Sequence, residues 1–269
     1  MTTFPELHAS HALPSPRAAR RATILVVAAV LGFSTITIFA QLATRGGATL
    51  PSVLLLRYAL ALGPLILVAG RPAIRAVPVR RAIELTAIGG GLQSATAWLT
   101  LSALDYIPAA TLVFLFYTFP AWVTIFAAVR RTEPITPVRI AALVLALVGI
   151  ALTVGIRSNG AMKPVGVALA LTASVVYAAF LPIIRKIQGE TSPTAATVYI
   201  ALGAAAIFFA GAAFSHALAL PGSLLTWTWI AALALLGTAL PFTLFLSGLR
   251  TLGPMRTAIV STIEPFFVA

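Results

Sequence analysis

The sequence predicts an all-α integral membrane protein made of two inverted repeats, each of five transmembrane helices. Three observations lead to this fold class. Hydrophobic residues make up 60% of the 269 residues and charged residues only 9%, whereas a soluble domain carries about a quarter charged residues. The apolar residues lie in long runs joined by short connections, and segments of the second half of the chain match segments of the first.

The apolar runs define the predicted helices. A bilayer core takes about 20 residues of helix, and we assign nine spans on this basis, the last shorter than a full crossing. Residues 1–21, rich in Pro, Ala, Ser and His, are expected to form a disordered cytoplasmic tail. The run that follows is interpreted as a retained first helix, because residues 41–44 are not a convincing signal-peptide cleavage site. The predicted spans are 22–43, 52–70, 82–104, 107–128, 138–156, 164–184, 194–215, 224–246 and 255–269.

The net charge of +12 has two interpretations. A basic surface can bind nucleic acid, but in membrane proteins Arg and Lys are concentrated in the cytoplasmic connections. With a cytoplasmic N-terminus, fourteen of the 18 Lys and Arg lie on the cytoplasmic side, three lie on the other side, and Arg57 lies within a span. This bias predicts that orientation and no nucleic-acid partner. The fourteen are Arg17, Arg20, Arg21, Arg71, Arg75, Arg80, Arg81, Arg130, Arg131, Arg139, Arg185, Lys186, Arg250 and Arg256.

An internal repeat relates the two halves of the chain. SALDYI (102–107) matches SGLRTL (247–252), and the same spacing separates Pro120 from Pro265. Because each repeat contains five helices, an odd number, the second copy enters the membrane from the opposite side. Inverted repeats are typical of secondary transporters, whose substrate site lies between the halves. We assign the first repeat to residues 22–156 and the second, incomplete one to residues 164–269.

Four segments give the sequence a family resemblance. They are LLLRYALA (54–61), SALDYIPAATLVFLFYTFPAW (102–122), RRTEPIT followed by ALVLALVGIALTV (130–154), and LRTLGPMRTAIVSTIEPFFVA (249–269). With these segments the chain resembles the drug/metabolite transporter superfamily, specifically its EamA-type permeases. The resemblance implies ten helices with both termini cytoplasmic, so we expect the tenth helix to be missing and the chain to be truncated within the ninth.

The resemblance also implies a function. It implies a secondary transporter in a bacterial inner membrane that exports small organic metabolites, such as amino acids, by alternating access. The alternative is a non-transporting membrane fragment or subunit that needs a partner for the missing helix. The expected partners are the lipid bilayer and a small-molecule substrate, with a proton as the candidate coupling ion.

Arg57 and Glu264 are charged residues within predicted spans. An intramembrane charge costs about 2.5–3.5 kcal/mol on insertion scales and usually faces a cavity or a partner. Arg57 could bind a substrate carboxylate or act in gating; it could instead extend to the interface or bond helix-end carbonyls. Glu264 must be either paired or protonated in lipid. It could carry a coupling proton, or it could simply accept hydrogen bonds from a neighbouring helix.

The third span contains the segment GGGLQSATAW (89–98), which combines small and polar residues. Its glycines permit close helix packing, and its polar side chains need partners away from lipid. We predict that the substrate pathway is lined by Gln93, Ser94, Trp98, Tyr117 and Tyr177. The alternative for each is a hydrogen bond between helices without contact to substrate.

Pro120 and Pro265 are predicted to kink the fourth and ninth spans. A proline inside a helix leaves the carbonyl one turn earlier without its usual donor, here that of Phe116 or Ser261. Such carbonyls beside a cavity can bind substrate. The alternative is that proline is simply common in membrane helices.

No motif indicates an enzyme. The chain has no cysteine, its three histidines lack ligand spacing, and it has no P-loop. We therefore expect no metal, no cofactor and no ATP-driven transport. A membrane enzyme would need several converging titratable groups, and only Arg57 and Glu264 lie clearly within spans.

Overall fold

The structure, a computed structural model, describes residues 15–130, 136–137, 140–141, 143–145, 148, 163–215 and 218–264. Every regular element in this part of the chain is a helix. The predicted tail up to residue 14, most of the fifth span and Pro265 lie outside the described residues.

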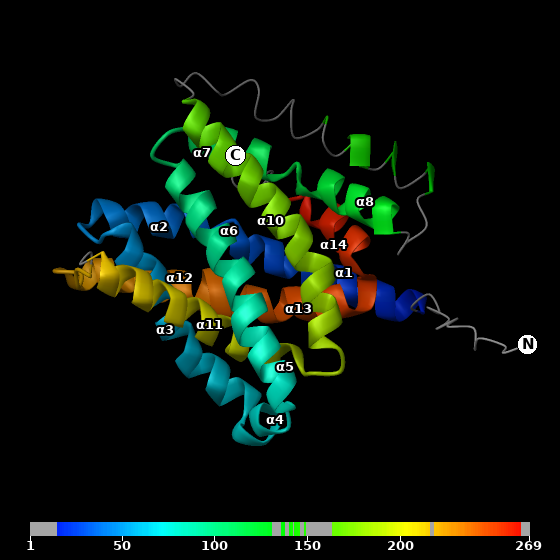
Figure 1. Cartoon of the computed structure of the whole chain (residues 1–269), viewed down its shortest axis with the longest axis horizontal. Coiled ribbons are helices and arrows are strands. Elements are labelled where there is room, and N and C mark those ends of the chain that lie inside the picture. Colours follow the sequence, from blue (N-terminus) through cyan, green and yellow to red (C-terminus); the bar gives the residue numbers. More distant parts are fainter. Residues whose placement is uncertain are drawn as a thin grey trace, which may run out of the picture.

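Thirteen α-helices and two π-helices make up the described part (Figure 1). The α-helices are α1 (Pro16–Phe33), α2 (Ile36–Arg45), α3 (Leu50–Ala69), α4 (Arg71–Arg75), α5 (Val79–Glu84), α6 (Gly90–Ala103), α7 (Ala109–Phe116), α8 (Phe119–Arg130), α10 (Pro164–Gln188), α11 (Pro193–Phe214), α12 (Leu224–Ala234), α13 (Leu240–Leu252) and α14 (Pro254–Ser261). The π-helices are η1 (Leu85–Gly89) and η2 (Leu235–Ala239).

Six helical runs among the described residues are long and apolar enough to cross a membrane. They are Pro16–Arg45, Leu50–Ala69, Ala109–Arg130, Pro164–Gln188, Pro193–Phe214 and Leu224–Leu252. The predicted third span, 82–104, is also helical from Val79 to Ala103, but it is not one of the six. Its glycines, Gln93 and hydroxyl residues reduce its hydropathy, and many of them are buried inside the bundle.

The first helix begins earlier than we predicted. Ser15 caps it by accepting a hydrogen bond from the amide of Ala18 at 3.3 Å, and Pro16 occupies its first position. Both residues favour a helix start. The assignment of residues 16–21 to the disordered tail is therefore wrong.

Several spans are interrupted near their middles. The first span breaks at Ser34 and Thr35, whose hydroxyls donate to the carbonyls of Leu31 and Gly32 at 2.8 and 2.7 Å. The fourth breaks between α7 and α8, where the Thr118 hydroxyl donates to the carbonyl of Leu115 in α7 at 2.7 Å. Such side-chain bonds compete with the helical backbone pattern. The breaks therefore occur where hydroxyl residues interrupt apolar runs.

The packing of the helices follows the internal repeat. Helices α3 and α11, the second spans of the two repeats, pack against each other. Helix α1 packs on α13, and the equivalent pair is α10 on α6. Likewise η2 contacts α3 and η1 contacts α11. Exchanging the repeats maps the α3–α11 contact onto itself and each of the other contacts onto its counterpart, as a twofold relation requires.

Two glycines allow α6 and α11 to approach closely. A methyl group added to Gly90 would lie 2.7 Å from the Cα atom of Gly203, too close for any carbon–carbon contact. The adjacent Gly91 faces open space. Small residues at such crossings let membrane helices gain packing energy.

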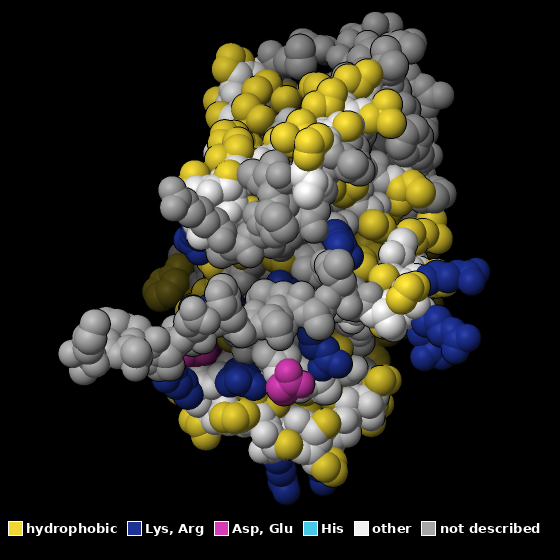
Figure 2. Space-filling model, turned by 90° about the vertical axis from the view of Figure 1, so that its right-hand side faces the viewer, with side chains coloured by type: hydrophobic (Ala, Val, Ile, Leu, Met, Phe, Trp, Pro, Cys, Tyr) yellow, Lys and Arg dark blue, Asp and Glu magenta, His cyan; other side chains and the backbone are white. Residues whose placement is uncertain are grey.

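Basic side chains are numerous on the side of the molecule where α1 begins. Figure 2 shows this side, which is on the right in Figure 1, and many Lys and Arg side chains lie across it. Hydrophobic side chains cover the upper part of the same view.

Candidate substrate cavity

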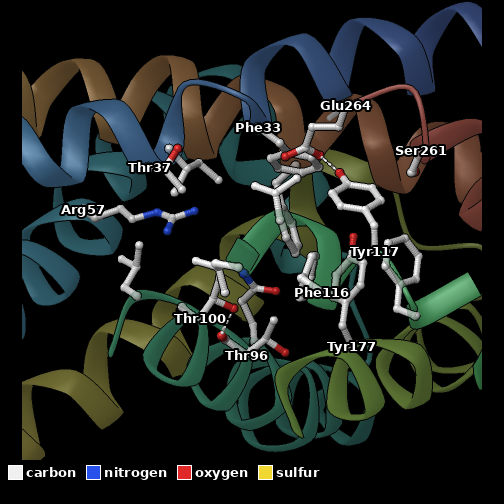
Figure 3. A pocket seen from close by; sticks show the side chains of 18 residues that line it. Phe33, Thr37, Arg57, Thr96, Thr100, Phe116, Tyr117, Tyr177, Ser261 and Glu264 are labelled. Carbon is white, nitrogen blue, oxygen red and sulfur yellow. Dashed lines mark hydrogen bonds between the residues drawn. The ribbon is translucent and has the colours of Figure 1, made fainter. Parts of the chain in front are cut away.

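A cavity of about 110 Å³ lies where the two repeats meet. The first span contributes from both sides of its break, and α3, α6, α10, α13 and the α7–α8 segment contribute one wall each (Figure 3). Ser261, the last residue of α14, and Glu264, which follows it, complete the lining. The lining residues are Phe33, Ile36, Thr37, Arg57, Gln93, Thr96, Ala97, Thr100, Leu101, Leu112, Val113, Phe116, Tyr117, Phe119, Tyr177, Phe242, Ser261 and Glu264.

Arg57 supplies the positive charge of the cavity. Its side chain is 3% exposed, so it does not extend to the interface. Its Nε atom donates to Thr238 Oγ1 at 2.6 Å, and one terminal nitrogen donates to the Gly237 carbonyl at 3.4 Å. Its guanidinium carbon lies 5.1 Å from the ring centroid of Tyr58. Arg57 thus crosses from the first repeat to the second.

The partners of Arg57 are all neutral within the described part of the chain. The ion pair found there joins Arg80 and Glu84 on α5, away from the cavity. Thr238 can accept from Arg57 because its own hydroxyl proton goes to the carbonyl of Leu233, five residues earlier in α12. π-helices often occur at functional sites. Here η2 provides oxygen acceptors for a buried cation but no opposite charge.

Glu264 lies on the other side of the cavity, together with Tyr117 and Ser261 (Figure 3). The Tyr117 hydroxyl donates to the Glu264 carboxyl group. Tyr117 occupies the break between α7 and α8, and Glu264 follows α14, which has the equivalent place in the second repeat. The repeat therefore brings the break in the fourth span and the end of α14 together at this hydrogen bond.

Aromatic rings form the apolar wall between the two polar sides. Phe116 and Phe119 lie 5.3 and 4.9 Å from the ring of Tyr177. Phe33 packs edge-on against Phe242 at 6.1 Å. Edge-on and tilted aromatic pairs of this kind are stabilising, so the wall is built as one packed cluster.

The remaining polar groups in the cavity are mainly acceptors. Thr96, Thr100 and Ser261 each donate their hydroxyl proton to a carbonyl one turn earlier, at 2.9, 2.6 and 2.9 Å. Their oxygens therefore offer lone pairs to the cavity. The Gln93 amide nitrogen donates to the Tyr58 hydroxyl at 3.0 Å, while its buried carbonyl oxygen has no hydrogen-bond partner among the described residues.

The structure brings together five of the residues that we predicted to line a substrate pathway: Arg57, Gln93, Tyr117, Tyr177 and Glu264. Ser94 and Trp98 do not line this cavity.

Helix geometry explains why Gln93 lines the cavity while Ser94 and Trp98, on the same helix α6, do not. The lining residues Gln93, Thr96, Ala97 and Thr100 are spaced by three and four positions and share one face. Ser94 lies off this face and donates to the Gly90 carbonyl at 2.7 Å, while Trp98 is 43% exposed.

Pro120 is the second residue of α8, directly after the break in the fourth span. It is buried but does not line the cavity. A helix start tolerates proline well, so at this position it begins a half-helix. Pro265, the predicted equivalent in the ninth span, lies outside the described residues.

Sequence reasoning missed two parts of the site. Phe33 and Thr37 enter the cavity because the first span breaks between them. The only signal was the pair Ser34–Thr35 inside an apolar run. The Arg57 acceptors Gly237 and Thr238 were also missed, although the run GTALP (237–241) places small, hydroxyl and proline residues within a span.

Comparisons with known proteins agree with this architecture. The family model described as the EamA-like transporter family matches residues 20–155 and 164–269. A solved structure titled "Crystal structure of protein" is 21% identical, with a TM-score of 0.69, and the match covers 92% of this chain and 85% of that one. A search of curated proteins gives no match.

Proposed function

Because the chain belongs to the EamA-like transporter family, it is a multi-pass membrane transporter, and we propose that it exports small organic metabolites such as amino acids by alternating access. The observation that carries this proposal is the cavity between the repeats. One side holds the Arg57 cation and the other the Glu264 carboxyl group, with aromatic rings between them.

The chemistry of the cavity favours a small zwitterion. Arg57 has N–H donors beyond the two that η2 accepts, and an arginine pairs well with a carboxylate. The free carbonyl oxygen of Gln93 and the hydroxyl oxygens of the cavity suit a cationic amine. The aromatic wall suits an apolar side chain. A volume of about 110 Å³ favours a small ligand in this conformation.

Alternating access follows from the positions of the helix breaks. The first and fourth spans are interrupted beside the cavity, at Phe33 and Tyr117, and α14 ends beside it at Ser261. The two repeats can rock against each other about a site placed between them and open it to either side in turn. Glu264 is the proposed site of a coupling proton, since it faces Tyr117 and Tyr177 and shares the cavity with Arg57.

The proposed location is the inner membrane of a bacterium, with the N-terminus in the cytoplasm. The basic side shown in Figure 2 would then face the cytoplasm. This is the orientation that the distribution of Lys and Arg favours.

A flux assay with the purified chain in proteoliposomes tests the proposal. We expect saturable counterflow of small amino acids, with weaker counterflow of matched amines that lack the carboxylate and of acids that lack the amine. Empty vesicles and vesicles with the Arg57→Gln protein serve as controls. A folded chain that moves none of these compounds would contradict the proposal and favour a non-transporting subunit.

A further inference from the structure

A second hollow lies between α11 and the segment α4–α5–η1. Its volume is about 470 Å³. It does not share a lining residue with the cavity. The groove is lined by Arg75, Val77, Val79, Ala82, Ile83, Thr86, Ala87, Tyr199 and Leu202.

A hydrogen bond joins the two walls of the groove, and the apolar side chains between them remain exposed. The Tyr199 hydroxyl on α11 donates to the carbonyl of Ile74 on α4 at 3.0 Å, which ties the two walls together. Several apolar side chains around it remain open: Val79 is 76% exposed, Ile83 61% and Leu202 46%. Exposed apolar side chains on the helices of a membrane protein can contact the acyl chains of lipids.

The rim of the groove is basic. The stretch from Arg71 to Glu84 contains four arginines and one carboxylate. Arg80 pairs with Glu84 at 3.0 Å, and Arg81 turns toward the Thr191 hydroxyl. Arg71 and Arg75 are exposed and have no ion-pair partner among the described residues. The uncompensated guanidinium group of Arg75 therefore lines an apolar groove, and Arg71 lies one turn earlier on the same helix, α4.

We propose that this groove binds one anionic glycerophospholipid of the adjacent leaflet. The headgroup phosphate would pair with Arg75 and Arg71, since guanidinium and phosphate groups form bidentate hydrogen bonds. One acyl chain would lie along Val79, Ile83 and Leu202. The Thr86 hydroxyl in the wall lies among these apolar residues and suits the ester groups. A lipid with a zwitterionic headgroup brings its own cation, which the arginines would repel.

Native mass spectrometry of the detergent-purified chain tests the proposal. The probes are phosphatidylglycerol and phosphatidylethanolamine with identical acyl chains, together with inorganic phosphate. We expect one phosphatidylglycerol to be retained in preference to phosphatidylethanolamine. Arg75→Gln should weaken this retention about fivefold, as expected for one arginine near an anionic headgroup. Arg45→Gln, on the far side of the molecule, should leave it unchanged.

A second variant tests whether the apolar groove itself contributes to lipid retention, in addition to the contact between arginine and headgroup. Ala82→Phe would fill the groove without removing charge and should also weaken phosphatidylglycerol retention. Equal retention of the two lipids, unchanged retention in both variants, or full competition by inorganic phosphate would overturn the proposal. So would a second copy of the chain occupying the groove in place of lipid. Thermal unfolding in detergent confirms that each variant is folded.

Discussion

Arg57 brings a full positive charge to a cavity in which the described residues offer it only neutral partners. A buried charge without a counter-ion is costly, and its cost falls when an anion enters. The Thr238 and Gly237 oxygens hold the guanidinium in place until then. A carboxylate ligand therefore gains both a strong hydrogen-bonding partner and the relief of an uncompensated charge.

Replacing Arg57 should selectively weaken the binding of carboxylate ligands. Hydrogen bonds to charged groups contribute about 1.5–3 kcal/mol, so Arg57→Gln should raise the KM for amino acids roughly 10- to 100-fold. Counterflow in proteoliposomes gives this value. Arg45→Gln is the matched control because it removes an arginine from outside the cavity. An equal loss for ligands with and without a carboxylate would argue against direct binding.

The proposed proton-coupling role of Glu264 can be tested separately from its structural hydrogen bond to Tyr117. Glu264→Gln keeps an oxygen that accepts from Tyr117 but cannot take up or release a proton. We expect this variant to lose uptake driven by a pH gradient while retaining expression and counterflow. Tyr117→Phe, which removes the hydrogen bond and leaves the carboxyl group, should retain the response to the gradient. Undiminished proton-driven uptake in Glu264→Gln would exclude the coupling role.

At the scale of helices, two features form the site: irregular helices around the cavity and close packing behind it. The π-helix η2 turns Gly237 and Thr238 toward Arg57, and the broken spans admit Phe33 and Tyr117 to the cavity. Behind them, α6 is held to α11 at Gly90 and Gly203. Since α6 carries Gln93, the width of this crossing fixes the position of its amide in the cavity.

Gly90→Ala should destabilise the protein. The added methyl group would meet the backbone of Gly203 at 2.7 Å, and backbone cannot move aside as a side chain can. Overpacking of this kind costs about 1–3 kcal/mol. Thermal unfolding in detergent should show a lower midpoint for Gly90→Ala. Gly91→Ala is the control, because Gly91 is the next residue of the same helix and faces open space. Its unfolding midpoint should be close to that of the parent protein. An equal decrease of the midpoint in both variants would mean that helix packing is not the cause.

At the scale of the whole molecule, composition and repetition were sufficient to predict the fold class. Apolar runs show where a helix crosses a membrane, because the bilayer requires it. They do not show where the helix breaks or which face meets the partner repeat. Gln93 and Ser94 are neighbours of similar polarity, and only the rotation of α6 separates the residue that lines the cavity from the one that does not. Arg57 could be singled out because its charge is rare in such runs, whereas its partner Thr238 could not.

The absence of cysteine from the sequence allows the whole-molecule motion to be followed with single thiols. Thr100→Cys places one thiol in the cavity, and Ala76→Cys places one on an exposed connection between α4 and α5. If the repeats tilt about the cavity, a membrane-impermeant thiol reagent should reach Cys at position 100 from either side of the membrane. A bound amino acid should slow that reaction, because it occupies the cavity and favours the closed arrangement.

The control position should react from one side alone, at a rate that substrate does not change. Labelling of the position-100 thiol from one side alone, with no effect of any small metabolite, would be incompatible with alternating access. The repeat explains why both sides should be reachable. The contacts of α1 with α13 and of α6 with α10 are equivalent pairs, so an arrangement that opens one side has a counterpart of similar packing that opens the other.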